Sequence, residues 1–171
     1  GIRLVRIANF ADSSLGFSED SVCLPDEYAK EYKEFLLKEH DVLIAMSGAT
    51  TGKIGFVATE NLPCLLNQRV GRFSIVNEEK LAARYLFHFL LRPSVKKRIL
   101  ELAGGSAQPN ISPTQLKAFR IPLPPISEQQ KFAALVEKVE SLRAKQRESE
   151  SELEELFNSL MQRAFRGELV S

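Results

Sequence analysis

The last quarter of the chain constrains the fold most, because residues 126–166 contain neither proline nor glycine. Two prolines precede this stretch and cannot extend a helix backwards, and Gly167 follows it as a natural residue to end a helix. Ser127 and Gln130 have the spacing of a capping box at its start. At the usual rise per residue, the stretch predicts one helix roughly 60 Å long, several times the ordinary length in globular proteins.

Apolar residues recur along this helix every three or four positions, which is the spacing of a coiled-coil seam. Charged residues dominate its middle, and a polar middle favours a solvated helix over the alternative of a helix packed on its own domain. The candidate dimerisation residues, including one polar residue at the centre of the seam, are Phe132, Leu135, Val139, Leu142, Gln146, Leu153, Leu156 and Leu160.

The order of charges along the helix predicts how two copies pair. Basic residues dominate the first half, up to Arg147, and a run of glutamates begins at Glu148. A parallel pair in register would place like charges side by side, whereas an antiparallel pair centred near Gln146 sets the basic half against the acidic half. We therefore expect an antiparallel homodimer in which Gln146 meets its own copy.

Composition bounds the rest of the chain. Residues 42–125 contain eleven Lys/Arg and four Asp/Glu, a net charge of +7, which favours a polyanionic partner. No apolar run approaches the roughly 18 residues of a membrane span. Cys23 and Cys64 lie in apolar contexts and predict buried thiols in a reducing cytoplasm. His40 and His88 share no metal-ligand spacing, so neither a metal nor another cofactor is expected.

Residues 1–125 predict both strands and helices. Apolar runs predict strands at residues 2–7, 42–46, 54–58, 65–68, 70–76 and 119–123, with a loop at residues 9–19. Amphipathic periodicity predicts helices at residues 26–38, 79–91, 94–103 and 112–118, the last with a capping box at Ser112 and Gln115. The fold class is therefore α+β: a mixed α/β domain over residues 1–125, followed by a long coiled-coil-type helix over residues 126–171.

Two motifs resemble catalytic sites and fail on inspection. The loop from Gly48 to Lys53 has three residues between its glycines where a phosphate loop needs four, and Ile54 replaces the magnesium-binding hydroxyl. The same loop remains suited to meeting a DNA phosphate. Asp26 and Glu31 imitate a nuclease pair, but they fall on a predicted surface helix rather than on a rigid strand scaffold. The chain is therefore expected to have no catalytic site of its own.

Several stretches in order resemble one family. They are Asp-Val-Leu-Ile-Ala-Met-Ser-Gly-Ala-Thr-Thr-Gly-Lys-Ile-Gly at 41–55, Asn-Gln-Arg at 67–69, Gly-Ser-Ala-Gln-Pro-Asn-Ile-Ser at 105–112, Ile-Pro-Leu-Pro-Pro-Ile-Ser-Glu-Gln at 121–129 and Arg-Ala-Phe-Arg-Gly-Glu-Leu at 163–169. Together they resemble the DNA specificity subunits of type I restriction-modification systems, over essentially the whole chain.

The resemblance implies a division of labour. In that family each target recognition domain reads a short DNA half-site, long helices pair, and separate modification and restriction subunits carry the catalysis. This chain departs from the pattern because it has one recognition domain and one helix, and because it begins at what resembles an internal strand. We therefore expect a natural half-subunit, a truncated product or a fragment that lacks the first strand of the family.

The leading hypothesis is sequence-specific binding of double-stranded DNA without enzymatic activity, and the alternative is a truncated assembly subunit that pairs through its helix but reads DNA poorly. The candidate DNA-binding residues are Arg3, Arg6, Thr50, Thr51, Lys53, Arg69, Arg72, Ser106, Gln108 and Asn110. Arginine suits guanine edges, and Asn and Gln suit adenine edges. Two alternatives stay open: Asn110 as an Asx turn before Ser112, and Arg72 as an outward strand position without a partner.

Overall fold

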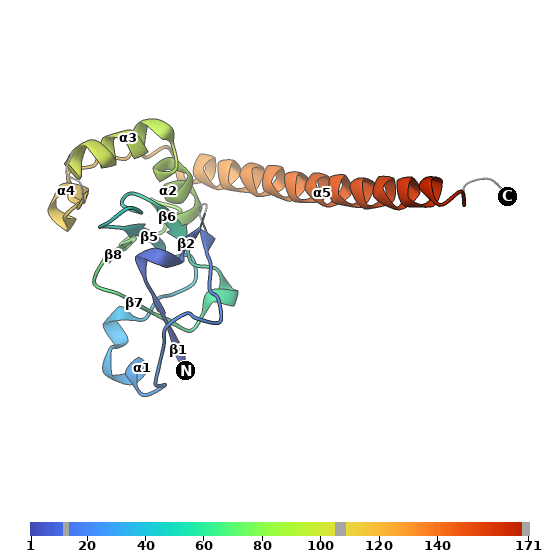
Figure 1. The fold of residues 1–171 in the computed structure, drawn as a ribbon. Coiled ribbons are helices and arrows are strands. Elements are labelled where there is room, and N and C mark those ends of the chain that lie inside the picture. Colours follow the sequence, from blue (N-terminus) through green and yellow to red (C-terminus); the bar gives the residue numbers. More distant parts are fainter. Residues whose placement is uncertain (12–13, 105–108, 169–171) are drawn as a thin grey trace. The chain divides into compact units, whose positions relative to one another are not determined.

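A computed structural model describes residues 1–11, 14–104 and 109–168 of the chain (Figure 1). The chain divides into two compact units, Gly1–Gln129 and Gln130–Ser171. The first unit combines β-sheets with short helices, and the long helix α5 (Ile126–Phe165) begins in the first unit and makes up most of the second. The predicted α+β class with a long C-terminal helix is therefore confirmed.

One three-stranded antiparallel sheet forms the centre of the first unit. Its order is β6 (Ile54–Phe56), β5 (Val42–Ala45) and β8 (Val70–Phe73). All four residues of β5 are buried, because Val42 and Ile44 pack in one hydrophobic cluster and Leu43 and Ala45 pack in another. Burial on both faces explains why this strand is continuously apolar rather than alternating.

A second three-stranded sheet has the order β4 (Cys23–Leu24), β1 (Ile2–Val5) and β7 (Cys64–Leu66). Strand β1 pairs antiparallel with β4 and parallel with β7. The stretch predicted as a loop contains the 3-10 helix η1 (Ile7–Asn9) and the antiparallel strands β2 (Phe10–Ala11) and β3 (Ser14–Leu15). Cys64 is buried as predicted, but Cys23 is exposed, so the prediction of two buried thiols was wrong for that residue.

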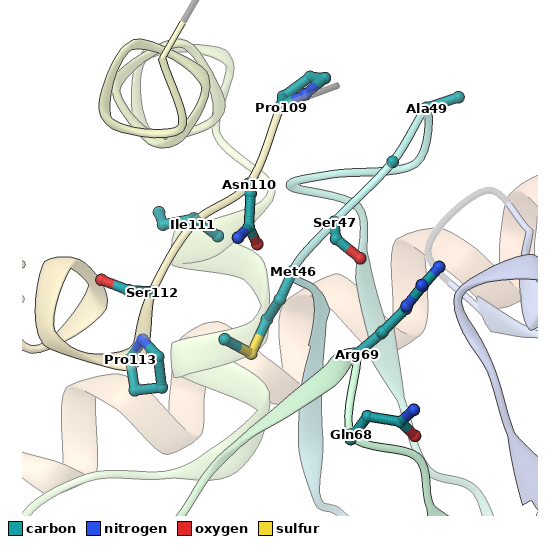
Figure 2. A pocket seen from close by; sticks show the side chains of 11 residues that line it. Met46, Ser47, Ala49, Gln68, Arg69, Pro109, Asn110, Ile111, Ser112 and Pro113 are labelled. Carbon is teal, nitrogen blue, oxygen red and sulfur yellow. The ribbon is translucent and has the colours of Figure 1, made fainter. Parts of the chain in front are cut away.

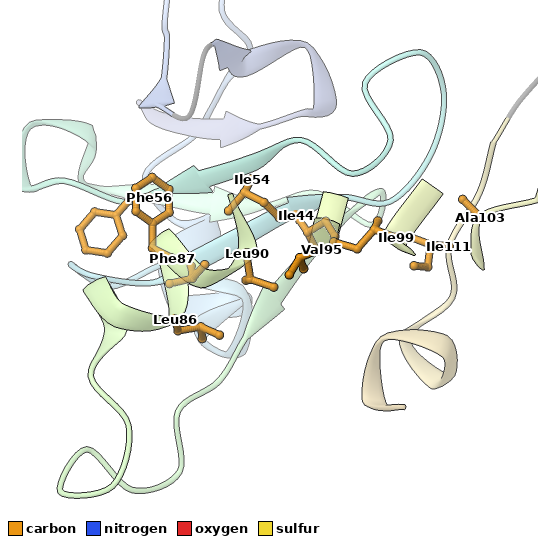
Figure 3. Close-up of a cluster of buried hydrophobic side chains, with 11 residues drawn as sticks. Ile44, Ile54, Phe56, Leu86, Phe87, Leu90, Val95, Ile99, Ala103 and Ile111 are labelled. Atoms are coloured by element: carbon orange, nitrogen blue, oxygen red, sulfur yellow. The ribbon is translucent and has the colours of Figure 1, made fainter. Parts of the chain in front are cut away.

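Helices α2 (Ala83–Leu90) and α3 (Pro93–Leu102) cover the Ile44 side of the central sheet (Figure 3). Both carry an apolar stripe at helical spacing, and their buried residues are Leu86, Phe87, Leu90, Val95 and Ile99. Helix α4 (Pro113–Lys117) begins with the predicted capping box: Ser112 Oγ accepts the N–H of Gln115, and Gln115 Oε1 accepts the N–H of Ser112. Gln115 Nε2 also donates to the Leu102 carbonyl at 2.7 Å, which ties α4 to α3.

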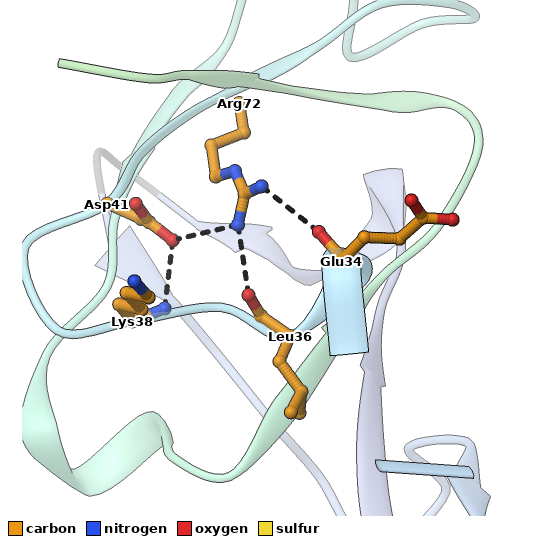
Figure 4. A network of polar contacts seen from close by, with 5 residues as sticks. All are labelled: Glu34, Leu36, Lys38, Asp41 and Arg72. Atoms are coloured by element: carbon orange, nitrogen blue, oxygen red, sulfur yellow. Dashed lines mark hydrogen bonds and ion pairs between the residues drawn. The ribbon is translucent and has the colours of Figure 1, made fainter. Parts of the chain in front are cut away.

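Two predicted elements do not form. Residues 26–38 are split into α1 (Tyr28–Glu31) and the 3-10 helix η2 (Lys33–Phe35), and residues 119–123 have no strand. Tertiary bonds compete with the end of such a helix: the Glu34 carbonyl accepts from Arg72, and the Lys38 N–H, its partner in a continuous helix, donates to Asp41 Oδ2 (Figure 4). In the second stretch, the Pro122 carbonyl accepts a hydrogen bond from Tyr85 Oη, and a proline offers no N–H to a sheet. A third 3-10 helix, η3, spans Thr59–Asn61.

Helix α5 begins one residue earlier than its predicted cap. The Pro125 carbonyl accepts the N–H groups of Glu128 and Gln129, so Ser127 lies inside the first turn and its capping box does not form. Gln129 fixes this turn in the first unit: it is fully buried, its Oε1 accepts the Ala82 N–H, and its Nε2 donates to the carbonyls of Lys80 and Pro124.

The C-terminal end of α5 follows the prediction. Gly167 adopts a φ of +73°, its N–H bonds to the Ala164 carbonyl, and the Glu168 N–H bonds to the Arg163 carbonyl. This is the Schellman pattern, which satisfies the last carbonyls of a helix. Over the part of the chain that is described, no helix combines the length and apolarity needed to cross a membrane.

Candidate nucleic-acid interface

Three segments that are distant in the sequence meet around an open cleft of about 890 Å³ in the first unit (Figure 2). They are the turn after β5, the residues before β8, and the residues before α4. The residues that line the cleft are Met46, Ser47, Gly48, Ala49, Gln68, Arg69, Pro109, Asn110, Ile111, Ser112 and Pro113. Three of the five motif segments that carried the family resemblance therefore contribute to one surface.

Backbone hydrogen bonds hold the three segments together. The Met46 N–H donates to the Arg69 carbonyl at 3.0 Å, and the Met46 carbonyl accepts the Ile111 N–H at 2.9 Å. The Gly48 N–H donates to the Pro109 carbonyl at 3.1 Å, next to a β-bridge between Ser47 and Asn110. Met46 thus lies between the other two segments, as Figure 2 shows, and the walls of the cleft are fixed by main-chain bonds.

Two glycines shape the turn after β5. Gly48 and Gly52 adopt φ values of +79° and +82°, which other residues rarely adopt. A Cβ atom at Gly52 would also lie 3.1 Å from Cγ2 of Ile99, so the turn packs tightly against α3. The sequence motif is therefore explained by backbone geometry rather than by nucleotide chemistry.

The polar side chains of the cleft suit the edges of DNA bases. Gln68, Arg69 and Asn110 are exposed, and the side chains of Arg69 and Asn110 form no hydrogen bond or ion pair with any described residue. Arginine pairs in a bidentate manner with guanine, and amide side chains pair with adenine. Met46 and the buried Ile111 provide an apolar floor between these groups.

Asn110 does not form the Asx turn that was its alternative interpretation. The Ser112 N–H is taken by Gln115 Oε1 at 2.8 Å, and the Asn110 N–H donates to the Ala103 carbonyl at 3.2 Å. Its amide is consequently available to a ligand in the cleft. Gln68, Ser47 and Met46 were not selected from the sequence, although the position of Gln68 directly before Arg69 was a usable signal.

The threonines and the lysine of the turn do not line the cleft. Thr51 is buried at 5% exposure, and its hydroxyl lies 2.7 Å from the Gly48 carbonyl and 2.9 Å from the Pro109 carbonyl. Its predicted DNA contact is therefore wrong in this geometry, and Thr51 instead holds the turn against the residues before α4. Thr50 Oγ1 is buried without a hydrogen-bond partner among the described atoms, and Lys53 Nζ donates to the Phe10 carbonyl at 3.3 Å.

Arg72 is a structural residue. Its guanidinium donates to the carbonyls of Leu36 at 2.9 Å and Glu34 at 3.1 Å, and it lies 3.6 Å from Asp41 Oδ2, whose side chain is 17% exposed (Figure 4). These bonds contradict the alternative of an outward position without a partner, and they give Arg72 a role within the fold; its DNA contact stays a prediction.

Arg3 and Arg6 lie away from the cleft. Arg3 Nη1 donates to the Glu60 carbonyl at 3.1 Å, and its guanidinium carbon lies 5.1 Å from the centre of the Phe17 ring. Arg6 lines a separate hollow of about 390 Å³. The remaining two candidates, Ser106 and Gln108, lie outside the described residues. Of the ten candidates, Arg69 and Asn110 are therefore the two that the structure brings together in the cleft.

Within residues 1–11, 14–104 and 109–168, no three His, Cys, Asp or Glu side chains are grouped so that they could hold a metal ion. The hydrogen-bonding groups, the cation and the apolar floor of the cleft are those of a recognition surface.

The first unit is thus an α+β domain with an open polar cleft, and it continues into a long helix with an apolar stripe. The sequence profile described as the type I restriction modification DNA specificity domain matches residues 19–155 of the chain. The chain therefore belongs to this family, which confirms the resemblance seen in its motifs.

Individual relatives agree with this assignment. The specificity subunit of the type I restriction enzyme MjaVIII from Methanocaldococcus jannaschii is 30% identical over 172 residues, covering 99% of this chain and 40% of that protein. The specificity subunit of EcoKI from Escherichia coli is 28% identical over 149 residues, covering 83% of this chain and 31% of that protein. The chain thus spans less than half the length of these relatives.

Solved structures show the same fold. A chain from a type I restriction-modification system superimposes with a TM-score of 0.64 at 23% identity, covering 99% of this chain and 39% of that one. The HsdS subunit from Thermoanaerobacter tengcongensis superimposes with a TM-score of 0.56 at 24% identity, covering 95% of this chain and 36% of that one.

Proposed function

We propose that this chain supplies one target recognition domain and one pairing helix of a type I specificity subunit, and that it binds double-stranded DNA without catalysing a reaction. The observation that carries the proposal is the cleft, in which Arg69, Gln68 and Asn110 surround an apolar floor in a domain of this family. In this proposal residues 1–125 read a DNA half-site, and residues 126–171 space and pair the readers.

The cleft reads bases in the major groove. Arg69 pairs with a guanine edge, Asn110 or Gln68 pairs with an adenine edge, and Met46 contacts a thymine methyl group. Because the backbone bonds through Met46 fix these segments, their geometry is set before DNA arrives, which reduces the entropy lost on binding.

The helix pairs antiparallel with a second copy. Four pairs of its apolar positions are mirrored about Gln146, the residue at the centre of the seam, whereas Leu142 is mirrored by Glu150. The mirrored pairs are 132 and 160, 135 and 157, 136 and 156, and 139 and 153. The seven apolar seam residues are between 39% and 65% exposed, which leaves apolar surface for a partner helix to bury. Two identical readers related by a twofold axis favour an interrupted palindrome as the DNA site.

The face of α5 opposite this seam is left for other subunits. Phe165 is 84% exposed there and forms a shallow hollow with Met161, Asn158, Gln162 and Arg166. In this proposal the modification (methyltransferase) and restriction subunits, which carry the catalysis, assemble around the paired helices in the cytoplasm, where the free thiols stay reduced.

Selection from a random pool of duplex DNA tests the function. The 171-residue chain should enrich an interrupted palindrome, and Arg69→Ala should weaken binding to that site by about 1–3 kcal/mol while leaving unrelated DNA unaffected. Arg69→Lys is the matched control for charge, because lysine keeps the cation but loses the bidentate geometry. A chain that forms dimers but enriches no sequence would instead be the assembly subunit of the alternative hypothesis.

A further inference from the structure

The positive charge of the first unit is concentrated in one stretch of sequence, and none of the cations in that stretch lines the cleft. Residues 92–120 carry six Lys/Arg and one Asp/Glu, whereas the remaining residues of the Gly1–Gln129 unit carry ten and thirteen. This stretch is therefore at +5, and the rest of the unit is at −3. The six cations, all exposed and all on or beside α3 and α4, are Arg92, Lys96, Lys97, Arg98, Lys117 and Arg120.

These cations have no anionic partners among the described residues. None of the six forms an ion pair or a side-chain hydrogen bond with a described residue, in contrast to Arg3 and Arg72, which are held by carbonyl groups. Six unpaired charges close together repel one another, and an anionic partner would relieve that cost. Two of them are also pre-positioned, because Arg92 and Arg98 lie 6.0 Å from the ring centres of Phe89 and Phe119.

The cationic stretch is continuous with the wall of the cleft. The Ala103 carbonyl at the end of α3 accepts the N–H of Asn110, and Pro113 at the start of α4 lines the cleft itself. The turn at Gly52 packs on α3, and the side chain of Gln115 joins α4 to α3. A duplex seated in the cleft would therefore have the helices α3 and α4 within reach of its backbone.

We propose that the outer surface of α3 and α4, defined by those six cations, binds the phosphate backbone of the DNA whose bases enter the cleft. This inference rests on the proposed function and adds to it a surface that fixes the position of the duplex without reading its sequence. Phosphate contacts orient a protein on DNA and carry no direct sequence information.

Replacing the two adjacent lysines on α3 tests the inference. Lys96→Ala with Lys97→Ala should weaken binding roughly tenfold at about 0.1 M salt, to the selected duplex and to unrelated duplexes alike. The slope of log K against log salt should fall by about 1 to 2, since each lost phosphate contact removes roughly 0.9. The ratio between selected and unrelated DNA should stay constant, whereas Arg69→Ala should change it.

A matched control separates position from net charge. Lys30→Ala with Lys33→Ala removes the same charge from exposed lysines of α1 and η2, and it should leave affinity and salt slope unchanged. Two results would disprove phosphate binding by the surface on α3 and α4: both double variants weaken binding equally, or neither changes the salt slope while the wild-type chain binds its selected site. In both cases the proposed function stands. A wild-type chain that binds no duplex would overturn both. Unchanged circular dichroism verifies that the variants are folded.

Discussion

The first unit and helix α5 use the same apolar residue types with opposite results. In the first unit Leu43 and Ile44 are 0% and 1% exposed, because two sheets and two helices of the same chain cover both faces of β5. In α5 Leu135 and Leu153 are 62% and 65% exposed. Burying one such side chain stabilises by about 1.5–3 kcal/mol. The first unit obtains this stabilisation from its own residues, whereas the exposed leucines of α5 obtain little of it within the described residues.

Charged residues show a parallel contrast inside the first unit. Arg72 and Arg69 are three residues apart, yet the Arg72 side chain donates to two main-chain carbonyls, and the Arg69 side chain lines the cleft with no partner among the described residues. A side chain whose hydrogen-bond donors are already taken by the protein has few left for a ligand. An exposed side chain whose donors have no partner among the described residues is a candidate for recognition. The contrast between groups that are satisfied within the chain and groups that are left exposed therefore holds for single arginines as well as for the two units.

The largest expected effect comes from truncating the core. Ile44→Ala should lower the free energy of unfolding of the first unit by about 2–5 kcal/mol, since it leaves a cavity between the sheet and α2. All three tyrosines lie in this unit, at positions 28, 32 and 85, so tyrosine fluorescence in a urea titration reports on this unit alone.

Leu153→Ala is the control for that experiment. It makes a comparable truncation in α5 at a position that is 65% exposed, and it should leave the tyrosine transition in place. If both variants shift the urea midpoint of the tyrosine transition equally, then the stability of the first unit depends on α5 as much as on its own core, and the contrast between the two units fails.

The second effect concerns the helix pair. Leu142→Glu with Leu153→Glu places charges in the seam and should weaken self-association by about two orders of magnitude, because burying an unpaired charge is costly. Sedimentation velocity over micromolar concentrations measures it. Ala144→Glu with Asn158→Glu adds the same charge on the opposite face of the heptad and should leave the dimer intact. Wild-type protein that sediments as a monomer throughout this range would disprove the pairing.

The third effect separates the two arginines. Arg72→Ala removes two hydrogen bonds and an ion pair, and it should lower the free energy of unfolding by about 1–3 kcal/mol in the tyrosine-monitored titration. Arg69→Ala should leave that titration unchanged and weaken binding to the selected duplex. If instead the Arg72 variant were as stable as the wild type and the Arg69 variant were destabilised, Arg69 would be the structural arginine and this interpretation would be wrong.

The sequence predicted elements wherever local pattern and tertiary packing agreed. The apolar run at 42–46, the capping box at Ser112 and the glycine at 167 are local signals, and all three formed as expected. The helix at 26–38 failed because its periodic aromatics could not reveal that Arg72, more than thirty residues away, competes for the Glu34 carbonyl. The strand at 119–123 failed because apolar composition alone does not supply a neighbouring strand.

The site was predictable as a set of segments but not as a set of side chains. Sequence motifs located the turn after β5, the residues around 68 and those around 110, which form the cleft. They could not show that Thr51 faces inward to the Pro109 carbonyl, since alternation along a turn does not fix which side chain is buried. The cations of α3 and α4 were visible as composition, and their continuity with the cleft needed the hydrogen bonds of Asn110 and Gln115.

The smallest expected effect is a difference in the alkylation of the two thiols, which reports how tightly the first unit is packed. Burial raises the pKa of the Cys64 thiol to about 11, so at pH 8 roughly one in a thousand of these groups is a thiolate. Cys64 is also 0% exposed, whereas Cys23 is exposed. Iodoacetamide at pH 8 should therefore label Cys23 and spare Cys64, as peptide mapping by mass spectrometry will show, until urea unfolds the first unit.

The labelling rate of Cys64 in the core variant and in the seam variant tests whether the stability of the first unit depends on pairing of the helices. Ile44→Ala should speed the labelling of Cys64, because both residues belong to the unit that the truncation destabilises and labelling proceeds through opening of that unit. Leu142→Glu with Leu153→Glu should leave the rate unchanged, since the first unit keeps its own core when the helices separate. Fast labelling of Cys64 in the seam variant would mean that the first unit depends on the helix pair for its stability, and the contrast between a self-sufficient domain and a partner-dependent helix would not hold.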